Sequence, residues 1–438
     1  MEAIKEIALK GNELGGKVYY VGGYVRDKIL GIENKDIDIE VHGISPTALY
    51  DILSEVGEPM EFGKSFGVFS LKGIDIDIAM PRKERAVGTG HRDFEVEVSP
   101  FIGTFEAARR RDFTINALME DVLTGEIVDH FGGVEDLKKG VIRHIDDTTF
   151  VEDPLRVLRA AQFAARFDFV IAKETVALCR SIDISTLSME RIEEELKKAM
   201  LKADKPSKFF EALREVDQLD VWFPEIKALI GIEQDAKYHP EGDVWVHTME
   251  VIDRAAKHRN KASDAFNFML LALTHDLGKI VTTEKDGDRI HSIDHERKGL
   301  PLVKSFTDHI TRDKSIHRYL RNMVALHMMP NRYFSAKSSI KATNRMFDSA
   351  IAKEDLIWFA LCDHTGDEEE RKEFLYERLD IYEEYMSRPY VSGDDLIAAG
   401  LVPGKAFKDF MAFAHKLRLV GVKKDAALKQ VLAYAKTK

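Results

Sequence analysis

The chain has 438 residues, too many for one ordinary hydrophobic core, and its length predicts about two to four domains. With 45% hydrophobic and 32% charged residues, the composition is that of a globular protein and excludes a disordered or fibrous one. The formal net charge of -11 argues against a protein that binds polyanions over its whole surface, although it allows a local basic groove.

The first residues form an amphipathic stretch without an apolar signal core, and no apolar run reaches the length that spans a bilayer. Cys179 and Cys362 lie far apart in helix-like sequence without metal-type spacing. Both are therefore expected in the core of a reduced protein. These features predict a cytoplasmic protein with no membrane partner, and they leave its oligomeric state open.

Short strands, glycines and short helices alternate up to about residue 140, which predicts an α/β or α+β head with a small sheet. Strands are expected at 18–23, 36–41, 67–73 and 74–80. From Pro154 onward strand signals nearly vanish, and apolar residues recur at the spacing of one helix face. Everything after the head is therefore predicted to be helical.

Polar or turn-rich breaks near residues 145, 235 and 370 divide the chain. They predict four parts: a head, a helical neck and body, a third domain, and a C-terminal helical segment, over 1–145, 146–235, 236–370 and 371–438. Residues 401–438 carry nine Lys or Arg against two Asp. This cationic end is either a solvated helix or a contact for a nucleic-acid backbone.

Gly22 and Gly23 follow a predicted strand and open a short helix, where backbone N–H groups can bind an anion and Arg26 adds a cation. Asp36 and Asp38 are two positions apart on a strand and project to one face. A shared divalent cation such as Mg²⁺ would relieve their repulsion and support phosphoryl transfer. The simpler alternative is a strand whose polar side faces water.

Two arginine-rich segments follow, RRRDFTINA at 109–117 and EDPLRVLR at 152–159. Arginine presents a forked pair of donors to phosphate. Asp153 and Arg156, about one helical turn apart, can offer an acceptor and a donor to the edge of a base. Either segment could instead form salt bridges on a helix surface.

Five segments together, VGGYVRD, KDIDIE, RRDFTINA, EDPLRVLR and ERIEEELKK, resemble the class II tRNA nucleotidyltransferases in order and approximate spacing, over about residues 18–235. That family includes bacterial poly(A) polymerases. The resemblance implies an α+β, polymerase β-like nucleotidyltransferase head followed by helical neck and body domains. It also implies tRNA, CTP and ATP as partners and Mg²⁺ in the head.

The resemblance implies a role for each matching residue. Asp36 and Asp38 would bind metal, with Asp77, or else Asp75, as the third catalytic carboxylate. Gly22, Gly23 and Arg26 would bind the triphosphate, and Arg159 would lie near the phosphates. Arg111 would contact the nucleotide, with Asp112 and Asn116 at its ribose. Asp153 and Arg156 would read the incoming base. The segment from Arg82 to Phe94 matches a flexible loop that helps the family switch between C and A addition.

A second group of residues lies in the third domain. His275 and Asp276, followed by LGK, offer an imidazole and a carboxylate to one ion, and His247 and Asp363 could complete its ligand set. Residues 239–366 resemble the HD-domain metal-dependent phosphohydrolases. This resemblance implies His295 and His327 as ligands of a second metal, Lys279 as a phosphate contact, and a transition metal such as Ni²⁺ or Mn²⁺. A helical spacer that retains its metal is the alternative.

The sequence therefore predicts an enzyme that adds C, A or both to the 3′ end of tRNA, with a second phosphohydrolase activity. It leaves open whether CC, A or the whole CCA is added. Two alternatives remain: a poly(A) polymerase, and a phosphohydrolase whose head only senses nucleotides.

Overall fold

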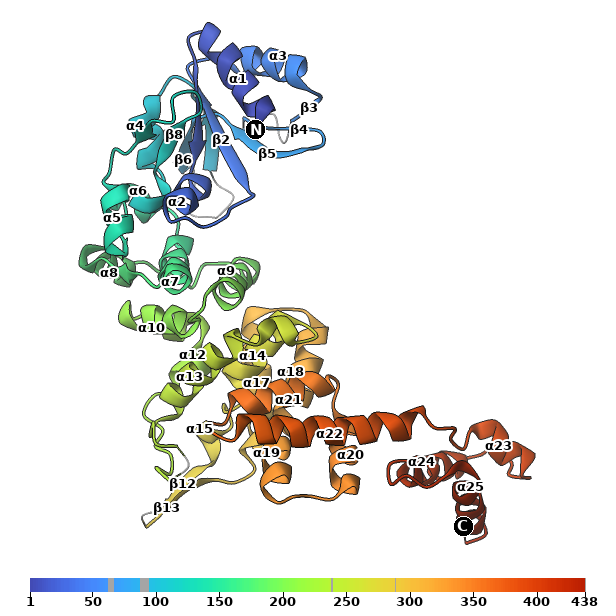
Figure 1. Ribbon diagram of the computed structural model, residues 1–438. Helices are drawn as coiled ribbons and strands as arrows, with labels where there is room; N and C mark the ends of the chain where they lie inside the picture. Colours follow the sequence, from blue (N-terminus) through green and yellow to red (C-terminus); the bar gives the residue numbers. More distant parts are fainter. Residues whose placement is uncertain (62–66, 87–93, 238, 288, 438) are drawn as a thin grey trace. The chain divides into compact units, whose positions relative to one another are not determined.

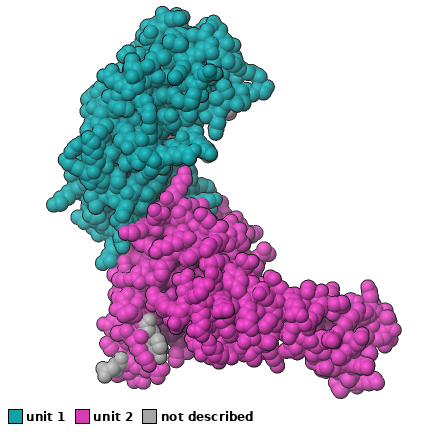
Figure 2. Space-filling model, in the orientation of Figure 1, with its two compact units in different colours: residues 1–199, 208–221 teal, residues 200–207, 222–438 magenta. Residues whose placement is uncertain are grey.

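The computed structural model describes residues 1–438 except 62–66, 87–93, 238, 288 and 438. The chain divides into two compact units, coloured separately in Figure 2. Unit 1 comprises residues 1–199 and 208–221, and unit 2 comprises residues 200–207 and 222–438. Among the described residues, no helix is both long enough and apolar enough to cross a membrane.

Unit 1 contains a seven-stranded sheet (Figure 1). Its strands are β1 Lys17–Val21, β2 Ile37–His42, β3 Pro59–Glu61, β4 Val68–Leu71, β5 Ile74–Ala79, β8 Met119–Asp121 and β9 Ile127–Val128. They lie in the order β3-β4-β5-β2-β1-β8-β9. Only β2 and β5 pair in parallel among these neighbours; the other pairs are antiparallel. The four strands predicted from the sequence correspond to β1, β2, β4 and β5.

Two amphipathic helices, α1 Glu2–Glu13 and α3 Pro46–Val56, pack against each other, and α1 also packs on β1. Ile4 and Ile7 of α1 and Leu49 and Leu53 of α3 are fully buried, so these helices cover one part of the core of the head. The apolar residues recur at three and four positions, so each helix turns one face inward.

The segment from Arg82 to Phe94 was predicted to be a flexible loop, and at both of its ends this is wrong. The strands β6 Arg82–Ala86 and β7 Phe94–Val98 pair in antiparallel register. The charged sequence of β6 carries no apolar alternation, so the strand has no signal in the hydrophobic pattern. Residues 87–93 lie outside the described part of the chain.

Helices dominate the rest of unit 1: α2 Gly23–Ile29, α4 Gly103–Arg109, α5 Gly133–Lys139, α6 Asp147–Phe150, α7 Leu155–Phe167, α8 Lys173–Arg180, α9 Met189–Lys202, which continues into unit 2, and α10 Ser207–Glu215, which begins there, with the 3₁₀ turn η1 Thr114–Asn116 and the short α11 Leu219–Trp222. The prediction that only helices follow Pro154 is wrong in detail. β11 Val170–Ile171 pairs in parallel with β10 Val141–Ile142. Strands of two residues are too short to show a period.

Unit 2 is arranged around α14 Ala265–Thr274, whose sequence AFNFMLLALT is apolar on all sides and buried throughout most of its length. It packs against α13 Val244–Ala256, α18 Lys314–Leu326 and α21 Lys353–Cys362. Further helices are α12 Pro224–Lys227, α15 Lys279–Thr282, α16 His295–Lys298, α17 Leu300–Ile310, α19 Met328–Ser335 and α20 Ile340–Ser349, with the 3₁₀ turn η2 Arg259–Lys261. The buried helix α14 thus ends directly before His275 and Asp276.

Unit 2 also contains a hairpin that the sequence did not predict, β12 Thr283–Asp286 and β13 Arg289–Ser292, paired in antiparallel register. Its side chains are mostly exposed or half-exposed, so no apolar face marks it.

Cys179 in unit 1 and Cys362 in unit 2 are both buried and free, as predicted. Burial alone raises the pKa of the Cys179 thiol to about 12, which makes it unreactive.

A long helix, α22 Glu368–Ser387, passes through residue 370, where the sequence suggested a domain boundary. It leads to three helices, α23 Gly393–Ala398, α24 Phe407–Arg418 and α25 Lys424–Ala435, which share their own small core. Leu396, Phe410 and Val431, one from each helix, are among the buried residues of that core. The four predicted domain ranges therefore stay predictions.

Candidate active sites

In the head, Asp38 and Asp77 lie opposite each other on the parallel strands β2 and β5. Asp36 lies one residue before β2 and is exposed. Burial, and next the carboxylate of Asp77, raise the pKa of Asp38, with a smaller effect from Asp36, while Arg111 lowers it. These carboxylates therefore repel each other, and a divalent cation that they share would remove the repulsion.

The two opposed carboxylates line a cavity of about 310 Å³. Its other lining residues are Val21, Ile39, Glu40, Ala79, Met80, Pro81, Arg82, Ala107, Arg110 and Arg111. Asp36 and Asp75 are not among the described residues that line it. This geometry favours Asp77 over Asp75 as the partner of Asp38, and it places three arginines, Arg82, Arg110 and Arg111, beside hard oxygen ligands of the kind that Mg²⁺ prefers.

Gly22 caps the start of α2 with φ 62°, a backbone conformation that favours glycine. A Cβ at this position would lie 3.0 Å from Nη1 of Arg111, so the absence of a side chain lets the guanidinium come close to the turn. The N–H group of Gly22 donates to the carbonyl oxygen of Leu118 at 3.3 Å. A phosphate contact at Gly22 and Gly23 stays a prediction.

Arg26, expected at the triphosphate, is buried, and only 3% of its surface is exposed. Its Nη1 donates to Oδ1 of Asn116 at 2.6 Å, and its Nη2 lies 2.6 Å from Oδ1 of Asp27. The guanidinium also lies over the rings of Phe163 and Phe167 on α7, at 5.2 and 4.7 Å from their centroids. In this structure Arg26 joins α2 to α7.

Asp112 and Asn116 continue the same chain of hydrogen bonds. Asn116 Nδ2 donates to Oδ1 of Asp112 at 2.9 Å, and Arg159 Nε donates to Oδ2 at 2.7 Å. Burial works against ionisation, but Arg159 and Asn116 hold the pKa of Asp112 below its ordinary value. The structure thus brings four predicted nucleotide-binding residues together: Arg26, Asn116, Asp112 and Arg159.

Glu40 is a residue of this site that the sequence reasoning missed. Its Oε2 lies 3.3 Å from Nη2 of Arg111, and its Oε1 lies 2.7 Å from Nε2 of His42. Although burial works against it, His42 and Arg111 lower the pKa of Glu40. The available signal was its position two residues after Asp38 on the same strand. Glu40 therefore holds Arg111 at the edge of the cavity.

Asp153 and Arg156, expected to read the base, have separate partners here. Both carboxylate oxygens of Asp153 accept from Arg191 Nη2, at 3.1 and 3.0 Å. Arg156 donates to the carbonyl oxygens of Thr149 and Arg110. Arg191 belongs to the quoted segment ERIEEELKK, but a contact across 38 residues has no signature in spacing.

The second site lies in unit 2, where the structure brings together all six predicted metal-binding side chains. Two groups of three have their ligand atoms within 4.8 Å of one another. The first is His247, His275 and Asp363, and the second is Asp276, His295 and His327. Among the described residues, groups of three closely spaced ligands occur in unit 2, whereas the carboxylates of the head form no such group.

Asp276 joins the two groups because its oxygens face different histidines. Oδ2 lies 3.2 Å from Nε2 of His275 and 3.8 Å from Nε2 of His247. Oδ1 lies 3.2 Å from Nε2 of His295 and 3.9 Å from Nε2 of His327. A carboxylate placed in this way can bridge two cations.

The histidines are oriented by bonds on their other ring nitrogen. The Nδ1 atoms of His275, His295 and His327 bond the backbone carbonyls of Ala272, Ser292 and Val324, at 2.9, 2.9 and 2.7 Å. A carbonyl only accepts, so each Nδ1 carries the proton and each Nε2 can bind a metal. His275 Nε2 is buried and lies 3.2 Å from Asp276 Oδ2 and 3.3 Å from Asp363 Oδ1, without the geometry of a hydrogen bond to either, which fits a ligand atom.

Charges at this centre shift several pKa values in opposite directions. Against the effect of burial, Asp276 and Asp363 raise the pKa of His275 to about 10. Burial, with His295 and His275, lowers the pKa of His327 to about 3. Although burial works against it, His275, Lys279 and His295 hold the pKa of Asp276 well below the usual range, and His247 and His275 do the same for the pKa of Asp363. The centre thus contains two anionic carboxylates among imidazoles, a donor set that suits a divalent transition metal.

A cavity of about 670 Å³ opens at this centre, and its lining includes His247, Asp276, His295 and Asp363. Lys279, expected to contact phosphate, also lines it. Its Nζ lies 2.7 Å from Oδ2 of Asp276 and donates to Oε1 of Gln234 at 2.6 Å. The cavity is large enough for a nucleotide-sized ligand.

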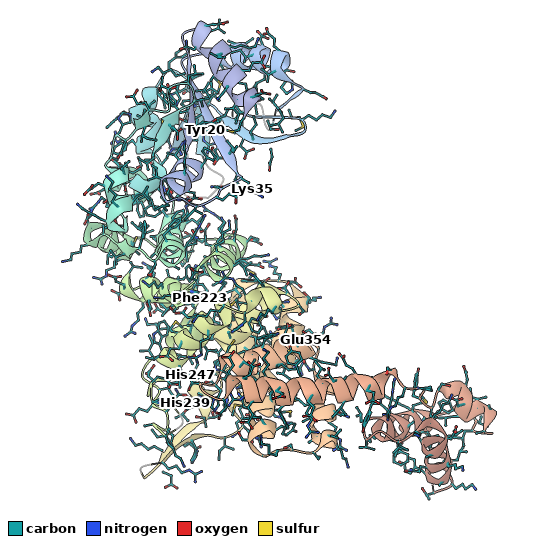
Figure 3. All side chains as sticks on the ribbon, viewed as in Figure 1. Tyr20, Lys35, Phe223, His239, His247 and Glu354 are labelled. Atoms are coloured by element: carbon teal, nitrogen blue, oxygen red, sulfur yellow. The ribbon has the colours of Figure 1, made fainter. Side chains whose placement is uncertain are left out.

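Two further residues of the lining, His239 and Glu241, were missed by the sequence reasoning. Glu241 Oε1 lies 2.7 Å from Nδ1 of His247 and 3.0 Å from Nδ1 of His239. His239 and His247, both labelled in Figure 3, have ring centroids 4.8 Å apart. A hydrogen-bond partner of a metal ligand has no fixed spacing, so only the structure reveals it.

Comparison with known proteins defines the class of the head. A family described as "Poly A polymerase head domain" matches residues 18–143, and one described as "Probable RNA and SrmB- binding site of polymerase A" matches residues 168–230. The "Multifunctional CCA protein" of Pasteurella multocida is 34% identical over 429 residues, which is 94% of this chain and 97% of that protein. That of Nitrosospira multiformis is 41% identical over 298 residues, covering 67% and 69%.

The chain belongs to the CCA-adding and poly(A) polymerase family, as the sequence resemblance predicted. Members of this family use divalent metal ions such as Mg²⁺.

Solved structures agree with the fold. A CCA-adding enzyme from Thermotoga maritima, in complex with tRNA, has a TM-score of 0.64 at 24% identity and covers 99% of this chain and 95% of its own. One from Bacillus stearothermophilus, in complex with CTP, has a TM-score of 0.67 at 19% identity, covering 100% and 98%. The predicted α+β head followed by a helical body is confirmed.

Proposed function

We propose that this chain adds C and A residues to the 3′ end of tRNA, with CTP and ATP as substrates. The observation that carries the proposal is the pair Asp38 and Asp77, opposed on β2 and β5 in a cavity that Arg111 also lines. The relatives that share most of this chain are multifunctional CCA proteins.

The residues of the head would have separate roles in nucleotide addition. Asp36, Asp38 and Asp77 would hold Mg²⁺, which supplies charge stabilisation to the attacking and leaving oxygens. The terminal ribose hydroxyl of the tRNA loses its proton to solvent and attacks the α-phosphorus. A new P–O bond forms while the bond from the α-phosphorus to the oxygen bridging to the β-phosphate breaks, and pyrophosphate leaves. Arg111, held by Glu40, stabilises the charge on the phosphates. Catalysis on this scheme is mainly positioning and electrostatics.

Asp153 and Arg156 would present an acceptor and a donor to the incoming base. Each oxygen of a carboxylate has two lone pairs, so Asp153 can accept from a base while Arg191 remains bonded to it. The hydrogen-bonded side chains of Arg26, Asn116, Asp112 and Arg159 would hold the ribose and phosphates between α2 and α7.

One assay distinguishes the alternatives for the head. Purified protein is incubated with tRNA transcripts that lack the last three nucleotides, lack only the final A, or are complete, with CTP and ATP singly and together. Products are resolved at single-nucleotide length. Addition of CC, A or CCA supports the proposal, whereas a long A tail indicates a poly(A) polymerase. No extension of any transcript favours a head that only senses nucleotides.

A second function is supported by the double group of ligands around Asp276. We propose that unit 2 hydrolyses phosphate esters with divalent ions, such as Mn²⁺ or Ni²⁺, for which the two groups of three ligands would supply the donor atoms. A cyclic 2′,3′ phosphodiester and a 2′-phosphate at an RNA end are the expected substrates. Hydrolysis of 2′,3′-cyclic AMP is measured with each metal and with chelator, and a rate that no metal raises would disprove this function.

The cationic C-terminal segment is proposed to contact the tRNA backbone. Six of its lysines are exposed: Lys405, Lys408, Lys416, Lys423, Lys429 and Lys436. Phosphate contacts of this kind make binding strongly dependent on salt.

A further inference from the structure

Glu241 lies between two histidines of unit 2 and bonds both through the same atom. Its Oε1 is 2.7 Å from Nδ1 of His247 and 3.0 Å from Nδ1 of His239. Both distances are those of N–H···O hydrogen bonds. Because an ionised carboxylate only accepts, each imidazole donates its Nδ1 proton to Glu241.

The bond to His247 fixes which nitrogen that ring presents to the metal centre. His247 Nε2 lies 3.1 Å from Oδ1 of Asp363 and 3.8 Å from Oδ2 of Asp276. In the structure Nε2 bonds Oδ1 of Asp363. With one proton held on Nδ1 by Glu241, a metal that replaces the Nε2 proton would find the Nε2 lone pair on the side of these two carboxylates. The other three histidines of the centre are held by backbone carbonyls, so His247 alone among them depends on a side chain.

The bond to His239 has a different consequence. His239 lines the same cavity as the metal-binding residues, and 28% of its side chain is exposed. Its ring lies edge-on to that of His247, with an interplanar angle of 85°. Since Glu241 occupies Nδ1, Nε2 is the ring nitrogen with which His239 can bond a ligand in the cavity.

We propose that Glu241 is a positioning residue with two tasks: it orients His247 toward the metal, and it holds His239 as a contact for the bound phosphate ester. The inference rests on the second function proposed above and adds to it the residues that organise the centre from the segment before α13. A carboxylate that fixes the tautomer of a metal-binding histidine typically contributes about 10- to 100-fold to metal affinity.

A different arrangement would make His239, Glu241 and His247 a metal site of their own, since their ligand atoms also lie within 4.8 Å of one another. A neutral imidazole has one lone pair, however, and His247 directs Nε2 to Asp363 and Asp276. It cannot serve a second ion through Nδ1 without losing its proton. The two arrangements differ in metal stoichiometry, which makes them separable.

The test measures Mn²⁺ binding to the full chain by calorimetry, independently of any activity. Glu241→Gln keeps the size of the side chain and removes its charge, and it should weaken Mn²⁺ binding by about 10- to 100-fold with unchanged stoichiometry. Glu233→Gln is the matched control, because Glu233 is an exposed glutamate that pairs with Lys285 and should leave binding unchanged. Thermal unfolding in chelator should be the same for all three proteins.

His239→Gln separates the second task from the first. It should leave Mn²⁺ affinity unchanged but raise KM for 2′,3′-cyclic AMP by about tenfold, with a smaller effect on kcat. Wild-type Mn²⁺ affinity in Glu241→Gln, or binding of fewer ions by that variant, would overturn the inference, as would an unchanged KM in His239→Gln. If the wild-type chain binds no Mn²⁺ at all, the proposed phosphohydrolase function fails instead.

Discussion

Asp38 and Asp77 come from strands 39 positions apart in the chain, yet the parallel register of β2 and β5 places them directly opposite each other. A parallel pair needs a long connection between its strands, and here α3, β3 and β4 supply it. The order of the strands therefore creates the acidic pair. Burial, and next the carboxylate of Asp77, raise the pKa of Asp38.

The first prediction concerns Asp77. Asp77→Asn should reduce incorporation of labelled CMP into tRNA by at least about 100-fold, because it removes a carboxylate that would help to hold the metal. The metal in turn would stabilise the charge that develops in the transition state. Asp75→Asn is the matched control, since Asp75 lies two positions earlier on β5 and is not the residue opposite Asp38 in the strand register. Equal losses in the two variants would show that Asp77 has no special role.

The second prediction concerns the buried pair Asp112 and Arg159. The folded pKa of Asp112 lies below its unfolded value of about 4, so the pair stabilises the fold above that pH and the effect is lost as pH falls through the folded pKa. Asp112→Asn should lower the free energy of unfolding by about 3–5 kcal/mol near neutral pH. Urea unfolding at several pH values should show this difference shrink below about pH 4.

A matched exposed pair serves as the control for that measurement. Lys72 and Glu58 have side chains 64% and 68% exposed. Glu58→Gln should change the free energy of unfolding by less than about 1 kcal/mol. An Asp112 variant as stable as Glu58→Gln would mean that the buried ion pair contributes nothing to folding.

The third prediction separates the two active sites. His275→Ala removes an imidazole that faces both Asp276 and Asp363, so hydrolysis of 2′,3′-cyclic AMP and Mn²⁺ binding should both be lost. CMP incorporation by the head should stay at the wild-type rate. His309→Ala, an exposed histidine on α17 of the same unit, should retain both activities. Hydrolysis that persists in His275→Ala would place the reaction elsewhere.

The fourth prediction concerns the cationic C-terminal segment. Replacing Lys408, Lys416 and Lys429 by glutamine should weaken tRNA binding, and the slope of log affinity against log salt should become shallower by about 0.7–0.9 for each phosphate that the protein no longer neutralises. Lys304→Gln, on an exposed lysine of α17, should leave the slope unchanged. If the triple variant binds tRNA with the wild-type slope, these lysines do not contact the tRNA backbone.

The sequence predicted those parts of the fold that have an apolar period. β1, β2, β4 and β5 alternate or run apolar, and in α7 and α13 apolar residues recur at three and four positions, so each was recognisable. β6 and the hairpin β12–β13 were missed because charged and polar residues fill them. In such strands, backbone pairing determines the structure and the side chains leave no pattern.

The sites divide in a similar way. Direct metal ligands were recognisable because Asp, His and their spacing carry the chemistry, as in the doublet His275 and Asp276. Glu40, Arg191 and Glu241 were not recognised as functional, although each bonds a predicted residue. Their role is to orient a neighbour, and orientation depends on distances that only the folded chain fixes.

The placement of Arg26 against two aromatic rings has a consequence for how this protein could be recombined. Phe163 and Phe167 lie beside its guanidinium, and Arg166 of the same helix reaches Asp27 at 3.2 Å. A gene fragment ending near residue 145 would leave Arg26 without its aromatic partners and Asp27 without Arg166. A functional exchange of heads between related genes would therefore place its crossover after Asp168, so that α7 is inherited with the head.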